Sequence, residues 1–159
     1  MKMQAKTKKA LTYLIAIAIP LAVGGVSALV NAGKLDGAGL VNPPLSPPTW
    51  LFPIVWTILF VLMGISAARV YLSECTGRND ALFLWGVQLV VVFLWTVFYF
   101  SFRALALSVF WLIFLILLVV LMAVRFSRCA AGAGKLQIPY LIWLCFAAYL
   151  NLASWILNR

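Results

Sequence analysis

Long apolar stretches, with charged residues only at their ends, dominate the chain. Five stretches without a charge cover residues 10–33, 37–68, 81–102, 104–124 and 136–158. A helix needs about 20 apolar residues to cross a bilayer, so each stretch is long enough to cross once. The stretches are continuously apolar and do not alternate with polar residues, as the strands of a membrane β-barrel would. The pattern predicts an all-α integral membrane protein, a bundle of five transmembrane helices.

The stretches also predict where the helices begin and end. We expect helices over approximately residues 10–31, 49–70, 81–101, 105–125 and 136–157, in a single membrane domain over residues 1–159. The second helix begins late because the prolines between Pro43 and Pro48 cannot be accommodated inside a helix. Residues 32–48 therefore form a Pro-rich first loop. A secretory signal cleaved near Ala28 is the alternative for the first stretch, although about 22 apolar residues are long for a signal.

Composition agrees with a membrane protein and excludes other classes. Hydrophobic residues make up 66% of the 159 residues and charged residues only 9%, too few to build a surface facing water. The net charge of +9 would suggest nucleic-acid binding if the basic residues shared one surface. They lie instead at the ends of apolar stretches, where they orient a chain in a bilayer. We expect membrane lipid around the protein and no nucleic-acid partner.

The positive charges are distributed unequally between the two ends of the predicted bundle. The N-terminus, the second loop and the fourth loop share one end and carry nine basic residues, against three at the other end, Lys34, Arg103 and Arg159. By the positive-inside rule, the N-terminus faces the inside of a membrane that is most naturally a prokaryotic plasma membrane. Cys75 and Cys129 then lie in inside loops, where they should stay reduced.

Several kinds of chemistry lack the residues they need. The chain has no histidine, and its three cysteines have no ligand-like spacing, so we expect no metal site and no required cofactor. The acidic residues, Asp36, Glu74 and Asp80, are all expected in loops. Proton-coupled transporters use carboxylates inside the membrane. Ion-driven transport is therefore disfavoured.

Three of the predicted helices carry a stripe of aromatic, small and weakly polar residues on one face. The stripes follow steps of three and four residues, which align side chains on a helix. They consist of Phe52, Trp56, Phe60 and Gly64 in the second helix, Gln88, Val92, Trp95 and Tyr99 in the third, and Tyr140, Trp143, Ala147, Asn151 and Ser154 in the fifth. Either the stripes line one cavity for a flat, conjugated ligand, closed at one mouth by the Pro-rich loop, or they are plain packing.

The polar and small residues within the stripes add further expectations. Gln88 and Asn151 are costly in hydrocarbon, so they should face the bundle interior and form hydrogen bonds between helices. Gly64 and Ala68 form a pair of small residues that indicates a close helix contact. Trp50, Trp85 and Trp155 lie near helix ends and suit an interfacial belt.

Two of these regions resemble the TspO/MBR family, also known as tryptophan-rich sensory proteins, translocator proteins or peripheral-type benzodiazepine receptors. The stretch NPPLSPPTWLFPIVWTILF at residues 42–60, continued by Met63 and Gly64, is similar to the family signature. PYLIW at residues 139–143, continued to Asn151, is a second similarity, and Gln88-Leu89 followed by Trp95 is a less complete third. The resemblance covers essentially the whole chain, and five spans is the family's topology.

The resemblance implies a membrane receptor or sensor with a pocket beneath the first loop. Its expected ligands are porphyrins, haem-related tetrapyrroles and synthetic benzodiazepine-type molecules. The family's pocket positions fall on Trp56, Phe60, Trp95, Trp143 and Ala147, and the stripes add Tyr140 and Asn151. Trp56 and Trp143 also match the pair implicated in light-dependent porphyrin breakdown in some bacterial relatives. That photochemistry is one alternative function, and porphyrin transport or a purely structural role are others.

The chain departs from the family pattern at several positions. Val92 stands where the middle helix usually carries an asparagine, which removes one polar contact to a ligand. Leu152 and Ile156 occupy the positions of the tyrosine and basic residue in the cholesterol pattern of animal members, so no specific cholesterol site is predicted. Gly86 is the small residue of the third helix that would fit a homodimer contact, but bulky residues surround it.

Overall fold

The computed structural model describes residues 2–34 and 40–159, and their side chains from residue 6 onward. Its long helices are α1 (Lys2–Val30), α2 (Leu51–Tyr71), α3 (Arg78–Thr96), α4 (Leu105–Cys129) and α5 (Ile138–Leu157). A π-helix, η1 (Val97–Ser101), continues α3, and a 3-10 turn, η2 (Lys135–Gln137), precedes α5. Within the described residues, five helices are long and apolar enough to cross a membrane. The predicted five-helix membrane bundle is confirmed.

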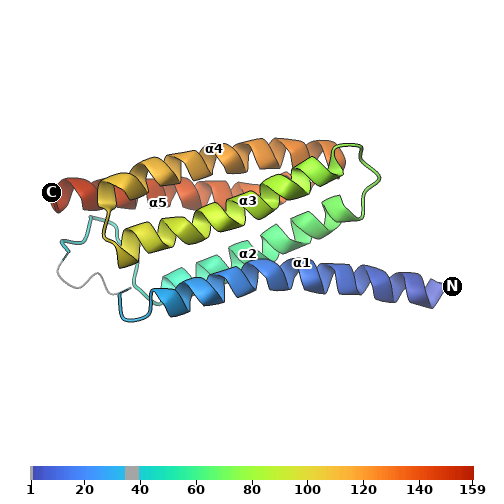
Figure 1. The fold of residues 1–159 in the computed structure, drawn as a ribbon, viewed down its shortest axis with the longest axis horizontal. Helices are drawn as coiled ribbons and strands as arrows, with labels where there is room; N and C mark the ends of the chain where they lie inside the picture. The colour runs from blue at the N-terminus through green and yellow to red at the C-terminus, as the bar shows by residue number, and fades with distance from the viewer. Residues whose placement is uncertain (1, 35–39) are drawn as a thin grey trace.

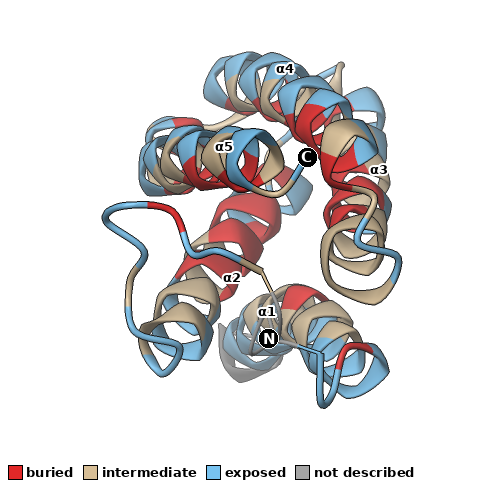
Figure 2. Ribbon diagram, turned by 90° about the vertical axis from the view of Figure 1, so that its left-hand side faces the viewer, coloured by how far each residue is buried: buried red, intermediate tan, exposed pale blue. Residues whose placement is uncertain are grey.

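The helices run side by side along one axis, and the two chain ends lie at opposite ends of the bundle (Figure 1). Helix α4 packs between α3 and α5, while α1 packs along α2. Buried positions of α2 to α5 turn toward the middle, whereas α1 lies at the edge and is mostly exposed or half-buried (Figure 2). In a bilayer those outer faces contact lipid.

Helices α1 and α2 approach each other closely because small residues meet at their contact. A Cβ atom on Gly64 would lie 2.5 Å from the Ile17 Cα atom and 2.6 Å from the Ala16 carbonyl oxygen, both in the α1 backbone. About two helix turns further towards the α1 C-terminus, Gly24 leaves room for the ring of Phe60. The close contact expected at Gly64 is confirmed, and it joins α1 to the rest of the bundle.

The loop before α5 dips into the bundle. Ala133 and Gly134 are buried in this loop, and the Ser66 hydroxyl of α2 donates a hydrogen bond to the Ala133 carbonyl oxygen at 2.7 Å. Helix α5 consequently begins inside the bundle, and its C-terminal end projects beyond the other helices (Figure 1). The N-terminal half of α5 lies beside α2 and α3, because the Tyr140 ring contacts Trp56 and its hydroxyl donates to Gln88.

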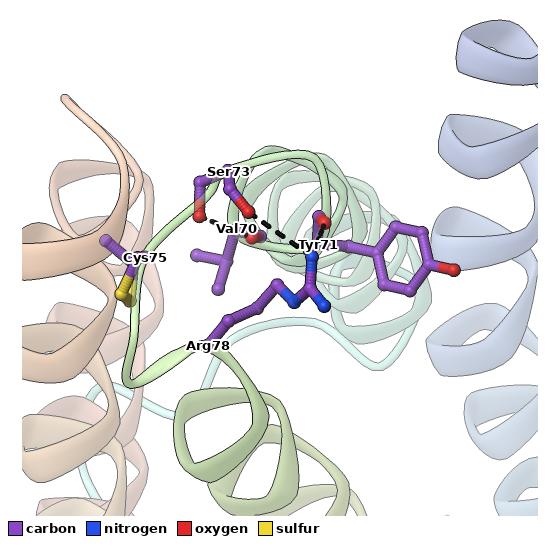
Figure 3. The surroundings of a disulfide bond; sticks show 6 residues. Val70, Tyr71, Ser73, Cys75 and Arg78 are labelled. Atoms are coloured by element: carbon purple, nitrogen blue, oxygen red, sulfur yellow. Dashed lines mark hydrogen bonds between the residues drawn. A yellow bond between two sulfur atoms is a disulfide. The ribbon is translucent and has the colours of Figure 1, made fainter.

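Cys75 and Cys129 form a disulfide, so the expectation that they stay reduced is wrong. The bond joins the α2–α3 turn to the end of α4, with Cα atoms 5.0 Å apart and a sequence separation of 54. Arg78 stabilises the same turn, because its guanidinium donates hydrogen bonds to the carbonyl oxygens of Tyr71 and Ser73 (Figure 3). The α2–α3 turn and the C-terminal end of α4 lie at the same end of the bundle, and the fold brings them together.

Two other sequence expectations need correction. Trp85 is only 9% exposed and lies in the core, so it does not belong to an interfacial belt, whereas Trp50 is 63% exposed as a belt residue should be. Asp80 lies in the first turn of α3, where the helix dipole favours a carboxylate, and not in a loop. Glu74 lies in the α2–α3 turn as expected, and Asp36 lies outside the described residues.

Candidate functional site

Aromatic rings from α2, α3 and α5 form the candidate site, in which Trp95 and Tyr140 are buried while Trp56 and Trp143 are half-buried. The indole of Trp56 is central, with ring centroids 5.4 Å from Phe60, 6.1 Å from Trp95 and 6.1 Å from Tyr140. Phe52 and Trp143 form an edge-to-face pair at 5.8 Å. We call these rings, together with Tyr99, the aromatic cluster. Three stripes predicted from separate parts of the sequence therefore converge on one place.

The π-helix at the end of α3 positions Tyr99 in this cluster. The Phe102 N–H donates to the Val97 carbonyl oxygen, five residues earlier, at 3.0 Å. Such wide turns rotate the side chains that follow and are frequent at functional sites. Here the Tyr99 ring stacks on Trp95 at 6.0 Å, and its hydroxyl is 2.9 Å from the Ser154 hydroxyl of α5.

Two buried amides are anchored by hydrogen bonds that cross between helices. The Tyr140 hydroxyl donates to Gln88 Oε1 at 3.1 Å, and Gln88 Nε2 donates to Met63 Sδ at 2.9 Å. The Ser108 hydroxyl of α4 donates to Asn151 Oδ1 at 2.8 Å. Both amide side chains are at most 1% exposed. Their predicted interior position and interhelical hydrogen bonding are confirmed.

Ser108 is the partner that sequence reasoning missed. It lies in the fourth apolar stretch, which is otherwise made of aliphatic residues, alanine, methionine and aromatics. A single hydroxyl in such a stretch was the available signal, because a polar side chain in the membrane interior needs a partner on a neighbouring helix.

Three hydrogen-bond donors on predicted site residues have no partner. They are Trp95 Nε1, Trp143 Nε1 and Asn151 Nδ2, and all three atoms are shielded from solvent. A buried donor without an acceptor costs about 1–3 kcal/mol, and most buried polar groups in folded proteins are paired.

The aromatic cluster is packed rather than open. A flat molecule stacked between two rings needs about 3.5 Å on each face, or about 7 Å between the rings. The Trp56 and Trp95 centroids are 6.1 Å apart and tilted by 35°, so a ligand between them would have to move the rings apart. A surface hollow of about 250 Å³ lies elsewhere, between the end of α4 and the start of α5, and is lined by Val124, Lys135 and Ile138 among others.

Side chains at the C-terminal end of α5 and just after it form hydrogen bonds with the described part of the Pro-rich loop. The Asn158 side chain forms two hydrogen bonds with the Val41 backbone, accepting from its N–H at 2.7 Å and donating to its carbonyl oxygen at 3.1 Å. The Tyr149 hydroxyl donates to the Pro44 carbonyl oxygen at 3.1 Å. These bonds fix one side of the loop at the end of the bundle where α2 begins.

The remaining predicted site residues also lie in the interior. Phe60 and Ala147 are each 7% exposed, and Phe60 fills the space between Trp56 and Gly24 of α1. Within the described residues, no three histidine, cysteine or acidic side chains lie close enough to hold a metal ion. The arrangement offers ring stacking and hydrogen-bond donation rather than acid–base chemistry.

Fold and site together define a class: a five-helix membrane protein with a tryptophan-rich interior shared by its second, third and fifth helices. Residues 16–156 match the model of the TspO/MBR family, and the chain belongs to this family. It is 34% identical to the tryptophan-rich protein TspO of Chlorobaculum tepidum, over 95% of this chain and 98% of the relative. It is 36% identical to protein CrtK of Rhodobacter capsulatus, over 92% and 90%. The translocator protein of Sus scrofa is 30% identical, over 74% and 72%.

Proposed function

We propose that this protein is a membrane receptor or sensor whose aromatic cluster binds tetrapyrroles such as porphyrins and haem-related molecules. Synthetic benzodiazepine-type molecules are further ligands of the same site. Residues 1–159 act as one domain in this proposal. The observation that carries it is the convergence of the three aromatic stripes around Trp56, because broad π-faces stack on flat, conjugated molecules.

The proposed ligand-binding residues are Trp56, Phe60, Trp95, Tyr140, Trp143, Ala147 and Asn151. Ring pairs involving Trp56 are tilted or edge-to-face, and none is a tightly stacked pair. Separating such rings loses an interaction energy of about 0.5–1.5 kcal/mol per pair, and stacking on a larger conjugated ligand can offset this loss. Binding in this proposal therefore includes a small opening of the cluster.

Replacing Trp56 and Trp143 together by phenylalanine should abolish saturable porphyrin binding. Phenylalanine keeps an aromatic ring but reduces the stacking area at both positions. The measurement is a titration of detergent-solubilised protein with protoporphyrin IX in the dark, read by tryptophan quenching and porphyrin absorbance. Trp111→Phe is the matched control, because Trp111 lies outside the cluster and donates to the Val91 carbonyl oxygen at 2.8 Å. Unchanged binding by the double variant would overturn the assignment of the site.

Light-dependent porphyrin breakdown is the second candidate function. It is favoured by Trp56 and Trp143, two indoles within one cluster that can steer the reaction of an excited porphyrin with oxygen without acid–base groups. Illuminating the titrated sample, with free porphyrin as the control, separates the two functions. A porphyrin breakdown product that forms only with the intact protein would favour breakdown as the function. If no such product forms, the sensor function is favoured.

We propose a prokaryotic plasma membrane with the N-terminus inside, on the strength of the basic residues at that end. The Cys75–Cys129 bond lies at the same end and favours the opposite orientation, because disulfides persist in oxidising compartments. A C-terminal alkaline phosphatase fusion should be active if the C-terminus is outside. If a C-terminal green fluorescent protein fusion is fluorescent and the phosphatase fusion is inactive, the C-terminus lies inside. The orientation is then opposite to the one proposed, and the disulfide lies outside.

A further inference from the structure

We propose that Cys75 and Cys129 form a reversible redox switch: they are two thiols in the reducing cytosol, and a hydroperoxide joins them into the disulfide. This inference rests on the proposed orientation, which places the pair inside, and on the proposed ligand site for its effect. Disulfides that form in the cytosol are usually transient and redox-sensing, whereas structural disulfides belong to oxidising compartments. A reversible bond therefore reconciles the disulfide with the basic residues at the same end of the bundle.

The pair lies where oxidants and reductants dissolved in water can reach it. Cys75 lies between α2 and α3, Cys129 is the last residue of α4, and both are half-buried. Arg128, the neighbour of Cys129, is exposed, as a basic residue at the water-facing end of a membrane span should be. Cys145 is the third cysteine of the chain, and it lies within the span of α5 as a free thiol. The fold therefore brings together the two cysteines that lie at a helix end.

Oxidation and reduction of the pair each transfer two electrons. A hydroperoxide oxidises one thiol to a sulfenic acid: the O–O bond breaks, the sulfur gains the hydroxyl group, and an alcohol leaves. The second sulfur then attacks the sulfenic sulfur, so that the S–S bond forms, the S–O bond breaks and water leaves with the thiol proton. Two thiols and one hydroperoxide thus give one disulfide, one alcohol and one water. A cytosolic dithiol returns the two electrons through a mixed disulfide.

The bond fastens together the ends of the helices that carry the aromatic cluster. Cys75 follows α2 and precedes α3 directly. Cys129 ends α4, and residues 130–134 are the whole connection from there to η2 and α5. This connection is fixed to α2, because the Ser66 hydroxyl donates to the Ala133 carbonyl oxygen at 2.7 Å. The ends of α2, α3, α4 and α5 therefore meet around one S–S bond.

Opening of the aromatic cluster requires these same helices to shift. Trp56 of α2 lies 6.1 Å from Trp95 of α3 and 6.1 Å from Tyr140 of α5, measured between ring centroids. A flat ligand that enters between them must move the rings apart. With the bond in place, the α2–α3 turn and the end of α4 stay together, which restrains this opening. The dithiol form consequently binds the ligand more tightly, and oxidation favours its release.

The first test counts free thiols in bacterial cells that express the protein. Cys145→Ser removes the third cysteine, so that only the pair remains. Cells are quenched with acid, and a maleimide carrying polyethylene glycol labels each free thiol and slows the protein on a gel. We expect two labels in unstressed cells, none after treatment with tert-butyl hydroperoxide, and two again after the peroxide is removed. A pair that is already unlabelled in unstressed cells would overturn the switch, and so would two labels that persist after the peroxide.

The second test measures the affinity of Cys145→Ser for protoporphyrin IX in the dark, after reduction by a dithiol and after oxidation by the peroxide. Each reagent is removed before the titration. We expect the reduced protein to bind at least about fivefold more tightly, the lower end of typical coupling between two sites. Cys75→Ser in the same background is the matched control, and it should bind like the reduced protein after either treatment. Equal affinity of the two forms, or tighter binding by the oxidised form, would overturn the effect on the cluster.

The two tests distinguish failure of this inference from failure of the proposed function. The thiol count needs no ligand, so it supports or overturns the reversible bond even if no porphyrin binds. No saturable binding by either form would remove the proposed function and the effect of the switch on it. Saturable binding that does not depend on the redox state would leave the function intact and remove only the effect of the switch.

Discussion

Substituting valine for Gly64 is expected to cause the largest loss of stability of any single substitution considered for this protein. The added Cβ would lie 2.5 Å from the Ile17 Cα atom and 2.6 Å from the Ala16 carbonyl oxygen. These are backbone atoms of α1, so no side-chain rotation relieves the overlap and α1 must move away from α2. Overpacking a core typically costs about 1–3 kcal/mol and sometimes more. A clash between two helix backbones belongs at the upper end, and we expect a loss of at least about 3 kcal/mol.

Thermal unfolding in detergent, followed by the monodisperse fraction that remains after heating, measures this effect. A loss of about 3 kcal/mol lowers the Tm by roughly 10 °C in a chain of this size. Gly25→Val is the matched control, because a Cβ at Gly25 meets no atom within 4 Å. The same Tm for both variants would show that α1 and α2 do not make this contact in the detergent-solubilised protein.

The helices and the converging stripes were predictable because hydrophobic runs and helical spacing are local properties of the sequence. Trp56, Trp95 and Tyr140 each belong to a set of residues spaced three or four apart, which lie on one face of their helix. That face is the one each helix turns toward the bundle. Burial of Gln88 and Asn151 was also predictable. An amide that faces lipid has no hydrogen-bond partner, so it is favoured inside the bundle.

Features that depend on how helices are offset along the bundle axis were not predictable. The buried loop at Ala133 shifts α5, and this shift sets which rings of α5 meet Trp56. The π-helix adds a residue to one turn, which a regular spacing of four cannot show. Trp85 was assigned by its distance from a helix end, although burial depends on which face it occupies. Long-range contacts decide all three.

Removing the Cys75–Cys129 disulfide should produce the second-largest loss of stability. The bond joins positions 54 apart in sequence, and the loop it closes contains α3 and α4. It therefore limits the freedom of the unfolded chain. Disulfides of this kind typically contribute about 2–4 kcal/mol. Cys75→Ser and Cys129→Ser should therefore each lower the Tm by roughly 5–15 °C. A reducing agent should lower the Tm of the unmodified protein by the same amount.

Cys145→Ser is the control, because Cys145 is an exposed free cysteine on α5. Its Tm should match that of the unmodified protein, and it should fall by the same amount on reduction. Cys75→Ser should show no further fall with the reducing agent, since it has no bond left to break. A reducing agent that leaves the Tm of the unmodified protein unchanged would show that the bond does not stabilise the fold. In that case the α2–α3 turn would be held by the Arg78 hydrogen bonds and by packing alone.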